Sequence, residues 1–217
     1  MTNAFTKGAE MARRMTEMTG AYDGAAIGAC SGLVEGTKIA TAMGFQRIET
    51  IEPGARVVTF DNGLQEVRAV RREPIWFAAG DCPRAMQPLF VPAGAIGNAQ
   101  DMVLLPHQAV LIESDAAEAA LGDPFVLMQA KDLDGICGIH RVTPEAPAFV
   151  VTLEFDNDEV VFAASGAMCI CPSRSDLAGM LTRPEGGREY RTIKSWTDAA
   201  LVNEIRGELD GGLAMAA

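Results

Sequence analysis

The chain has few positive charges and no long apolar run, and each shortage argues against a class of function. Its 217 residues contain 18 Lys and Arg against 29 Asp and Glu, which gives a formal net charge of −11. Such a charge repels phosphate backbones and anionic lipid surfaces, so we expect no nucleic-acid binding. The start of the chain has the pair Arg13-Arg14 but no apolar run behind it. We therefore expect neither a secretory signal nor membrane insertion.

Cysteine is also scarce. The five cysteines are odd in number and follow no regular spacing, which favours a reducing compartment over a disulfide scaffold. Together with the absence of a secretory-signal pattern, this cysteine content predicts a cytoplasmic protein, or one exported without a cleavable N-terminal signal.

The length and the 48% share of hydrophobic residues suffice for one sizeable core with appendages. Three methionines at helical spacing predict a short helix in a leader segment, residues 1–29, that ends in a flexible approach. Residues 30–172 are predicted to form a β domain. Residues 173–217 are predicted to form a helical tail, with helices over SDLAGML and SWTDAALVNEIRGELDGG and a stop at Gly211-Gly212.

The β prediction rests on a period of two that begins at Thr37. The run ARVVTFDNGLQEVRAV alternates apolar and polar residues around Asp61-Asn62-Gly63, where Asn-Gly suits a hairpin turn. Val57, Val67 and Val70 are expected to supply core contacts from this hairpin.

A second hairpin is predicted in FVVTLEFDNDEVVFAA, with Asp156-Asn157 at its turn. It echoes the first hairpin, which suggests two related halves. Between the two, a short helical turn is predicted over 114–121.

Ordered segments of the chain resemble the bacterial Hint domain, the Hedgehog/intein fold of self-processing proteins. The run GTKIATAMGFQRIETIEPGARVVTFDNGLQEVRAV resembles the opening of that domain, and PLFVPAGAIGN, LLPHQAVLI and VVTLEFDNDEVVFAASGA follow in the family's order. With the tail REYRTIKSWTDAAL the resemblance covers about residues 32–201. It implies a mainly β Hint fold of paired pseudo-symmetric hairpin halves, with a short N-terminal helix and C-terminal helices.

The resemblance also implies where the family's chemistry would lie. In the family a cysteine at the first position attacks the preceding carbonyl in an N-to-S acyl shift, aided by a hydroxyl and an imidazole from a Ser-Pro-x-His segment. Carried over residue by residue, the nucleophile position falls on Gly32, the hydroxyl position on Leu105 and the imidazole position on Gln108. At none of these three positions does the chain have the side chain that the family's chemistry requires. The resemblance thus implies a Hint domain without autoprocessing that acts as a binding or interaction module for an unidentified protein partner.

In an alternative interpretation the domain is active and uses residues that lie next to the aligned positions. Cys30 lies two residues before Gly32, and a displacement of two along an extended segment keeps the same face about 7 Å away. His107 lies one residue before Gln108, and a displacement of one turns the side chain to the other face unless a bulge intervenes. The alternative is an active domain that performs the acyl shift at Cys30 and releases residues 1–29.

A third hypothesis is a zinc-binding β protein. A CxxH loop and a CxC strand could supply two pairs of ligands, at Cys137, His140, Cys169 and Cys171. Their spacing is irregular, and small apolar segments of this kind also fill cores. The favoured interpretation therefore includes no metal and no cofactor.

Overall fold

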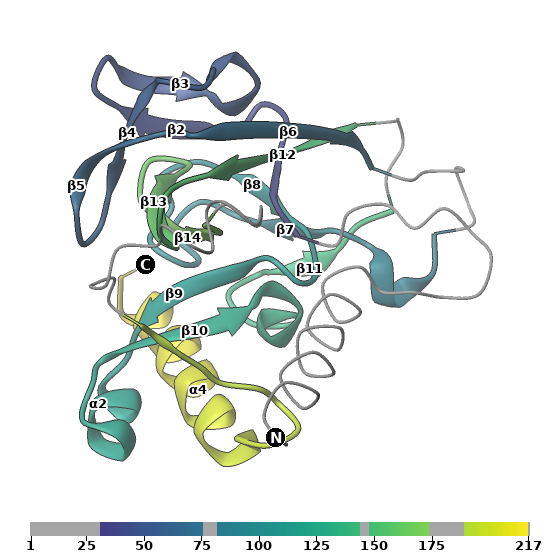
Figure 1. The fold of residues 1–217 in the computed structure, drawn as a ribbon. Coiled ribbons are helices and arrows are strands. Elements are labelled where there is room, and N and C mark those ends of the chain that lie inside the picture. Colours follow the sequence, from purple (N-terminus) through teal and green to yellow (C-terminus); the bar gives the residue numbers. More distant parts are fainter. Residues whose placement is uncertain (1–30, 76–81, 144–147, 174–188, 217) are drawn as a thin grey trace, which may run out of the picture.

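The structure is a computed structural model that describes residues 31–75, 82–143, 148–173 and 189–216. Two antiparallel sheets form the body, and two helices lie beside one of them (Figure 1). The predicted leader helix in residues 1–29, Cys30 and the predicted helix over SDLAGML lie outside the described residues.

The first sheet has six strands. Their spatial order is β11 (His140–Arg141), β7 (Leu89–Val91), β8 (Met102–Leu104), β1 (Leu33–Val34), β12 (Phe149–Glu154) and β6 (Ala69–Pro74). The two-residue strand β1 lies between β8 and β12, so the start of the described chain is held inside this sheet rather than at its edge.

The second sheet has nine strands. The main path runs β15 (Arg191–Thr192), β10 (Phe125–Gln129), β9 (Ala109–Glu113), β14 (Ala167–Cys171), β13 (Glu159–Ala163), β2 (Lys38–Thr41), β4 (Arg56–Thr59) and β5 (Gly63–Glu66), and β3 (Gly44–Arg47) pairs with β2. The strand pairs are antiparallel except β10 with β15. Three 3-10 turns, η1 (Ile48–Thr50), η2 (Arg84–Met86) and η3 (Ala130–Leu133), connect strands.

The first predicted hairpin is confirmed. β4 and β5 pair through the turn at Asp61-Asn62-Gly63, where Gly63 has a φ of +64°. Val57 and Val67 are fully buried, and Val70 packs partly buried against the same core. Alternation thus identified both the strands and their inward faces.

The second predicted hairpin is wrong. β12 pairs with β6 in the first sheet, whereas β13 pairs with β14 in the second, so the acidic turn at 156–158 carries the chain between sheets. Most residues of both strands are buried. Nearly continuous apolar strands suit inner positions covered on both faces, which a two-stranded ribbon does not provide.

The predicted short helix is confirmed as α2 (Asp115–Leu121), which begins after Ser114, whose side chain accepts a hydrogen bond from the Ala117 amide. The last helix, α4 (Ala199–Ala216), continues past Gly211 and Gly212, so the predicted stop is wrong. A glycine inside a helix costs only about 1 kcal/mol, which does not by itself end the helix.

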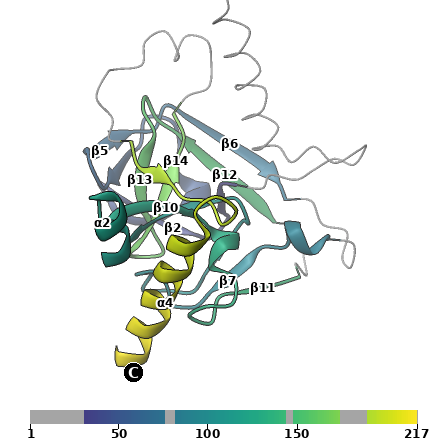
Figure 2. The same ribbon diagram turned by 90° about the horizontal axis from the view of Figure 1, so that it is seen from below.

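Helix α4 lies beside the β body (Figure 2). It is joined to that body by both apolar and polar contacts. Val202 and Ile205 belong to the main core. Glu208 accepts hydrogen bonds from the Ser114 hydroxyl and the Ala116 amide at the start of α2. Arg206 donates to the carbonyl of Asp132 in η3 and to that of Asp134 just after it, and Asp210 accepts from the Cys137 amide. The helix is therefore part of the same folded body as the strands.

Across the described ranges, no helix is both long and apolar enough to cross a membrane.

Candidate functional site

The site predicted from the resemblance begins at Gly32, the residue just before β1. Leu33 pairs with Val151 of β12 on one side and with Leu104 of β8 on the other. Because both neighbours fix the strand, the backbone at Gly32 has little freedom. Its φ is +107°, a conformation that residues with a side chain rarely adopt.

The space beside Gly32 is also closed to a side chain. A Cβ atom placed there would lie 2.6 Å from Val150 Cγ2 and 3.0 Å from Thr152 Oγ1. Both are side chains of the inner strand β12 and lie on the side where a nucleophile would project. The nucleophile position is thus filled by its neighbours.

Gln108 contacts Gly32 directly. Its Oε1 accepts a hydrogen bond of 2.8 Å from the Gly32 amide, and its Nε2 donates to the carbonyls of Ala109 and Ile170 at 2.9 and 3.0 Å. The side chain is only 2% exposed. A buried amide with this many partners is fixed in orientation, so Gln108 joins β1 to the second sheet.

The predicted hydroxyl position is apolar. Leu105 is 1% exposed and forms a small cluster with Ile75 and Val150, against which Val34 and Ala148 pack. Val150 is the residue that also blocks the Cβ of Gly32. The apolar cluster that contains Leu105 therefore also closes the space beside Gly32.

His107 has a different partner from its neighbour. Its Nδ1 lies 3.4 Å from Gln129 Oε1 of β10, whereas Gln108 contacts Gly32 and Ile170. Burial lowers the pKa of His107, and the positive charge of Lys131 acts in the same direction. Both effects favour the neutral imidazole, and its side-chain contact is with Gln129 of β10. The structure places Gly32, Leu105 and Gln108 around one site and leaves His107 out of the hydrogen bonds to it, while Cys30 lies outside the described residues.

The chemistry available at the Gly32 amide follows from these contacts. A carboxamide does not take up a proton near neutral pH, so Gln108 can orient the amide but cannot act as its general acid or base. The three positions themselves stay a prediction from the resemblance, and the sequence did not predict that Gln108 would hydrogen-bond to Gly32.

The four zinc candidates form no metal site in the structure. Cys169 and Cys171 lie buried on β14, whereas His140 is exposed and its Nδ1 lies 2.8 Å from the Gly138 carbonyl. The residues that the structure describes contain no group of three or more His, Cys, Asp or Glu placed to hold a metal ion. Burial raises the pKa of Cys171 to about 12 and raises that of Cys169 as well. The zinc hypothesis gains no support.

A second polar cluster, around Glu159, was missed by sequence reasoning. Glu159 of β13 is 3% exposed, and both carboxylate oxygens accept hydrogen bonds of 3.0 Å from Asn62 Nδ2. In the same turn, Asp61 accepts from the Tyr190 hydroxyl. The cluster fixes the β4–β5 turn to β13 of the same sheet. The only sequence signal was one acidic residue at the start of the apolar run EVVFA.

Stability should depend on pH through Glu159. Burial raises its pKa above the usual value, Asp61 and Asp158 also raise it, and the hydrogen bonds from Asn62 and Thr59 oppose the shift. The folded state then binds more protons than the unfolded state between the two pKa values, so this group's contribution to stability falls as pH rises through the folded pKa. We expect the free energy of unfolding of the wild type, relative to Glu159→Gln, to increase as the pH is lowered from 7 towards 4.5.

Urea unfolding of both proteins at several pH values measures this difference. The same replacement at the exposed Glu204 controls for the loss of one negative charge. A difference that stays constant over this pH range would contradict the prediction.

Comparison with known proteins identifies one family. The family model described as "Hint domain" matches residues 31–169, more than half of the chain. A search of curated proteins finds no match.

Several solved structures are similar in fold. The bacterial intein-like domain from Clostridium thermocellum is 15% identical, with a TM-score of 0.47, over 64% of this chain and 98% of that one. A splice-inactive variant of the AceL NrdHF class 3 split intein is 16% identical, with a TM-score of 0.43, over 66% and 99%. The MchDnaB-1 intein (N145AA) is 15% identical, with a TM-score of 0.38, over 65% and 99%.

Proposed function

The chain belongs to the Hint domain family, and we propose that it is a Hint domain without autoprocessing activity that acts as a binding or interaction module. The observation that carries the proposal is the contact between the Gly32 amide and Gln108, which occupies the centre of the predicted site with a group that cannot transfer a proton. Three further steps support it.

The first step concerns the nucleophile. An N-to-S acyl shift needs a thiol on the residue that follows the reacting carbonyl. Gly32 has no side chain, and its φ of +107° together with the nearby Val150 methyl leaves no room for one. Both the backbone and the packing at this position therefore suit glycine.

The second step concerns the base. Gln108 has the length to reach the Gly32 amide and makes the hydrogen bond that positions it. Gln108 fixes the orientation of the amide but transfers no proton, so the contact contributes to stability and not to cleavage.

The third step concerns the hydroxyl. Leu105 is buried in an apolar cluster with Ile75 and Val150. This cluster offers no donor to a developing oxyanion, which autoprocessing requires at the attacked carbonyl.

The experiment is an intact-mass measurement of the full chain after prolonged incubation with a small thiol and, separately, with hydroxylamine. We expect a single species at the mass of the whole chain, 23.0 kDa, under both conditions. Thiol-dependent appearance of residues 1–29 and of a fragment that begins at Cys30, abolished in Cys30→Ala, would establish the self-cleaving alternative. Cleavage between Ser31 and Gly32 would equally overturn the proposal.

A further inference from the structure

Four adjacent strands of the second sheet present a face that is turned away from the core. In β2 and β4, Ile39, Val57 and Thr59 are buried, so their neighbours in the strand point outward. With the residues paired to them on β3 and β5, these neighbours form a surface that we name the outer face. It consists of Lys38, Ala40, Phe45, Arg47, Arg56, Val58, Leu64 and Glu66.

An apolar row crosses the outer face. Ala40 pairs with Phe45 between β2 and β3, and Val58 pairs with Leu64 between β4 and β5. The pair Thr41 and Val57 joins β2 to β4, which brings Ala40 and Val58 next to each other one residue further on. The row is therefore continuous across four strands.

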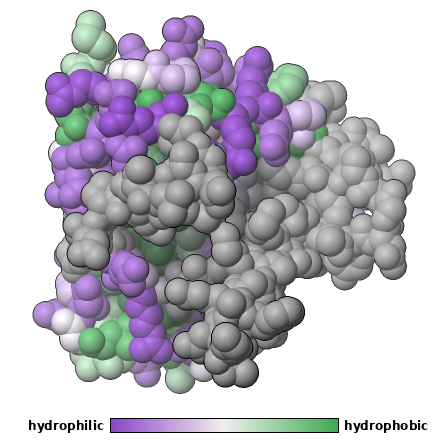
Figure 3. Space-filling view, viewed as in Figure 1, coloured by the Kyte–Doolittle hydropathy of each residue, from purple (hydrophilic) through white to green (hydrophobic). Residues whose placement is uncertain are grey.

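Two side chains of this row and a neighbouring methionine are exposed. Phe45 is 53% exposed and Leu64 is 38% exposed, and Met43 in the β2–β3 turn is 84% exposed. These are three of the five large hydrophobic residues that are exposed in the described ranges. Figure 3 shows green side chains among purple ones over the strands at the top of the view. Contiguous apolar surface with a polar rim is typical of interaction sites.

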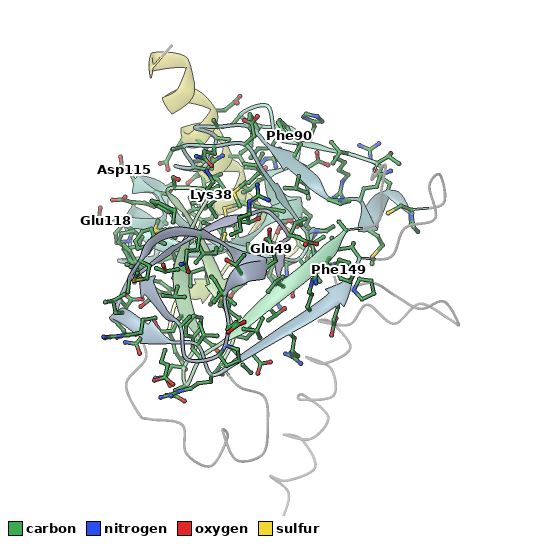
Figure 4. All side chains as sticks on the ribbon, turned by 90° about the horizontal axis from the view of Figure 1, so that it is seen from above. Lys38, Glu49, Phe90, Asp115, Glu118 and Phe149 are labelled. Atoms are coloured by element: carbon green, nitrogen blue, oxygen red, sulfur yellow. The ribbon has the colours of Figure 1, made fainter. Side chains whose placement is uncertain are left out.

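The charges beside the row have the opposite sign to the chain as a whole. The outer face has three cations, Lys38, Arg47 and Arg56, and one carboxylate, Glu66, which is bound by Arg68. Within the described ranges, no carboxylate lies within ion-pair distance of Lys38 or Arg56, and Arg47 reaches Glu49 only at 3.8 Å. Figure 4 looks at the molecule from the β3 side, with Lys38 and Glu49 near the middle and the acidic residues Asp115 and Glu118 at the edge.

We propose that the outer face binds an acidic amphipathic segment of a partner protein. Apolar side chains of the partner would cover the row from Phe45 to Leu64, and its carboxylates would pair with Lys38 and Arg56. The inference rests on the binding role proposed above and names the surface and the class of partner. Charge complementarity of this kind gives specificity and a fast association rate.

Two other occupants fit less well. A second copy placed face to face would bring three cations against three cations, which opposes association. An anionic membrane would attract the face but repel the rest of a chain with a net charge of −11.

The test uses the full chain labelled with ¹⁵N and a soluble fourteen-residue peptide with glutamate and leucine at amphipathic helical spacing. We expect saturable shifts of the amide signals of Ala40, Phe45, Val58 and Leu64. A peptide with lysine in place of glutamate, and one with serine in place of leucine, should bind at least tenfold more weakly. The variant Phe45→Ser/Leu64→Ser and the variant Lys38→Glu/Arg56→Glu should each weaken binding at least tenfold.

Trp196→Ser is the matched control, because Trp196 is 62% exposed and lies outside these four strands. It should bind as the wild type does. Each variant is checked by its amide spectrum, so a loss of folding is distinguished from a loss of contact.

Several results would overturn the inference. The proposal is contradicted if the acidic peptide does not bind at millimolar concentration, or if the lysine peptide binds equally well. It is also contradicted if the amide shifts are confined to other strands, or if binding is unchanged in the two double variants. Binding to vesicles containing phosphatidylserine in place of the peptide would assign the face to a membrane, and self-association lost in Phe45→Ser/Leu64→Ser would assign it to a second copy. Peptide binding that survives in the variants would reject this surface and leave the binding role intact, whereas self-cleavage would reject the proposed function independently.

Discussion

Gly32→Cys, which returns a thiol to the nucleophile position, is expected to lower the free energy of unfolding by about 4 kcal/mol. A side chain held at a φ of +107° costs about 1 to 3 kcal/mol in backbone strain. Its Cβ would also lie 2.6 Å from Val150 Cγ2, and overpacking of a buried site costs a further 1 to 3 kcal/mol or so. Urea unfolding monitored by circular dichroism measures the loss.

Gly36→Cys is the matched control. Gly36 also has a positive φ, +90°, but no atom lies within 4 Å of the Cβ that it would gain. Only the strain remains there, so we expect a loss of about 1 to 2 kcal/mol. If the two variants are equally stable, the clash with Val150 does not exist.

The double variant Gly32→Cys/Val150→Ala separates the two causes. Removing the Val150 methyls should relieve the clash but not the strain, so the two substitutions should be less destabilising together than the sum of each alone. We also expect Gly32→Cys to remain uncleaved in the intact-mass measurement. Gln108 supplies no base and its Nε2 hydrogens are bound to the Ala109 and Ile170 carbonyls, and Leu105 supplies no oxyanion donor. Cleavage in this variant would mean that only the nucleophile is missing.

The fold could be predicted where local pattern and tertiary structure agree. Alternation around Asn62-Gly63 identified the β4–β5 hairpin, and Ser114 identified the start of α2. The order of four segments identified the Hint fold. The second hairpin failed because pattern alone does not specify a strand's partner: β12 and β13 are consecutive in the chain and separate in space. The predicted end of α4 was wrong because a glycine lowers the helix propensity of a segment without by itself ending the helix.

The interactions at the candidate site could not be predicted from the sequence. The resemblance assigned roles to Gly32 and Gln108, which are 76 residues apart, and no local rule predicts that one binds the other. The φ of Gly32 and the position of the Val150 methyl are consequences of sheet pairing, so they are visible only once β1 lies beside β12. Glu159 illustrates the same point, because its partner Asn62 is 97 residues away.

Gln108→Leu is expected to lower the free energy of unfolding by about 3 kcal/mol. Leucine has a similar volume, so the change removes hydrogen bonds and leaves little cavity. The Gly32 amide loses the carboxamide oxygen that it binds at 2.8 Å, and the carbonyls of Ala109 and Ile170 each lose one donor. A buried polar group left without its partner costs about 1 to 3 kcal/mol, and the amide accounts for most of the loss because it has only one hydrogen to donate.

Gln129→Leu is the control, since Gln129 is half-buried and its hydrogen-bond partner, His107, lies at 3.4 Å. We expect it to cost less than 1 kcal/mol. Amide hydrogen exchange adds a local readout: Gly32 should lose protection in Gln108→Leu before the core of the second sheet does, because Gln108 is the contact that holds the start of β1 to β9 and β14. Equal stability of the two variants would show that Gln108 is dispensable for folding. Its contact with Gly32 would then have to be explained by chemistry at that amide, and the case for a purely structural site would fail.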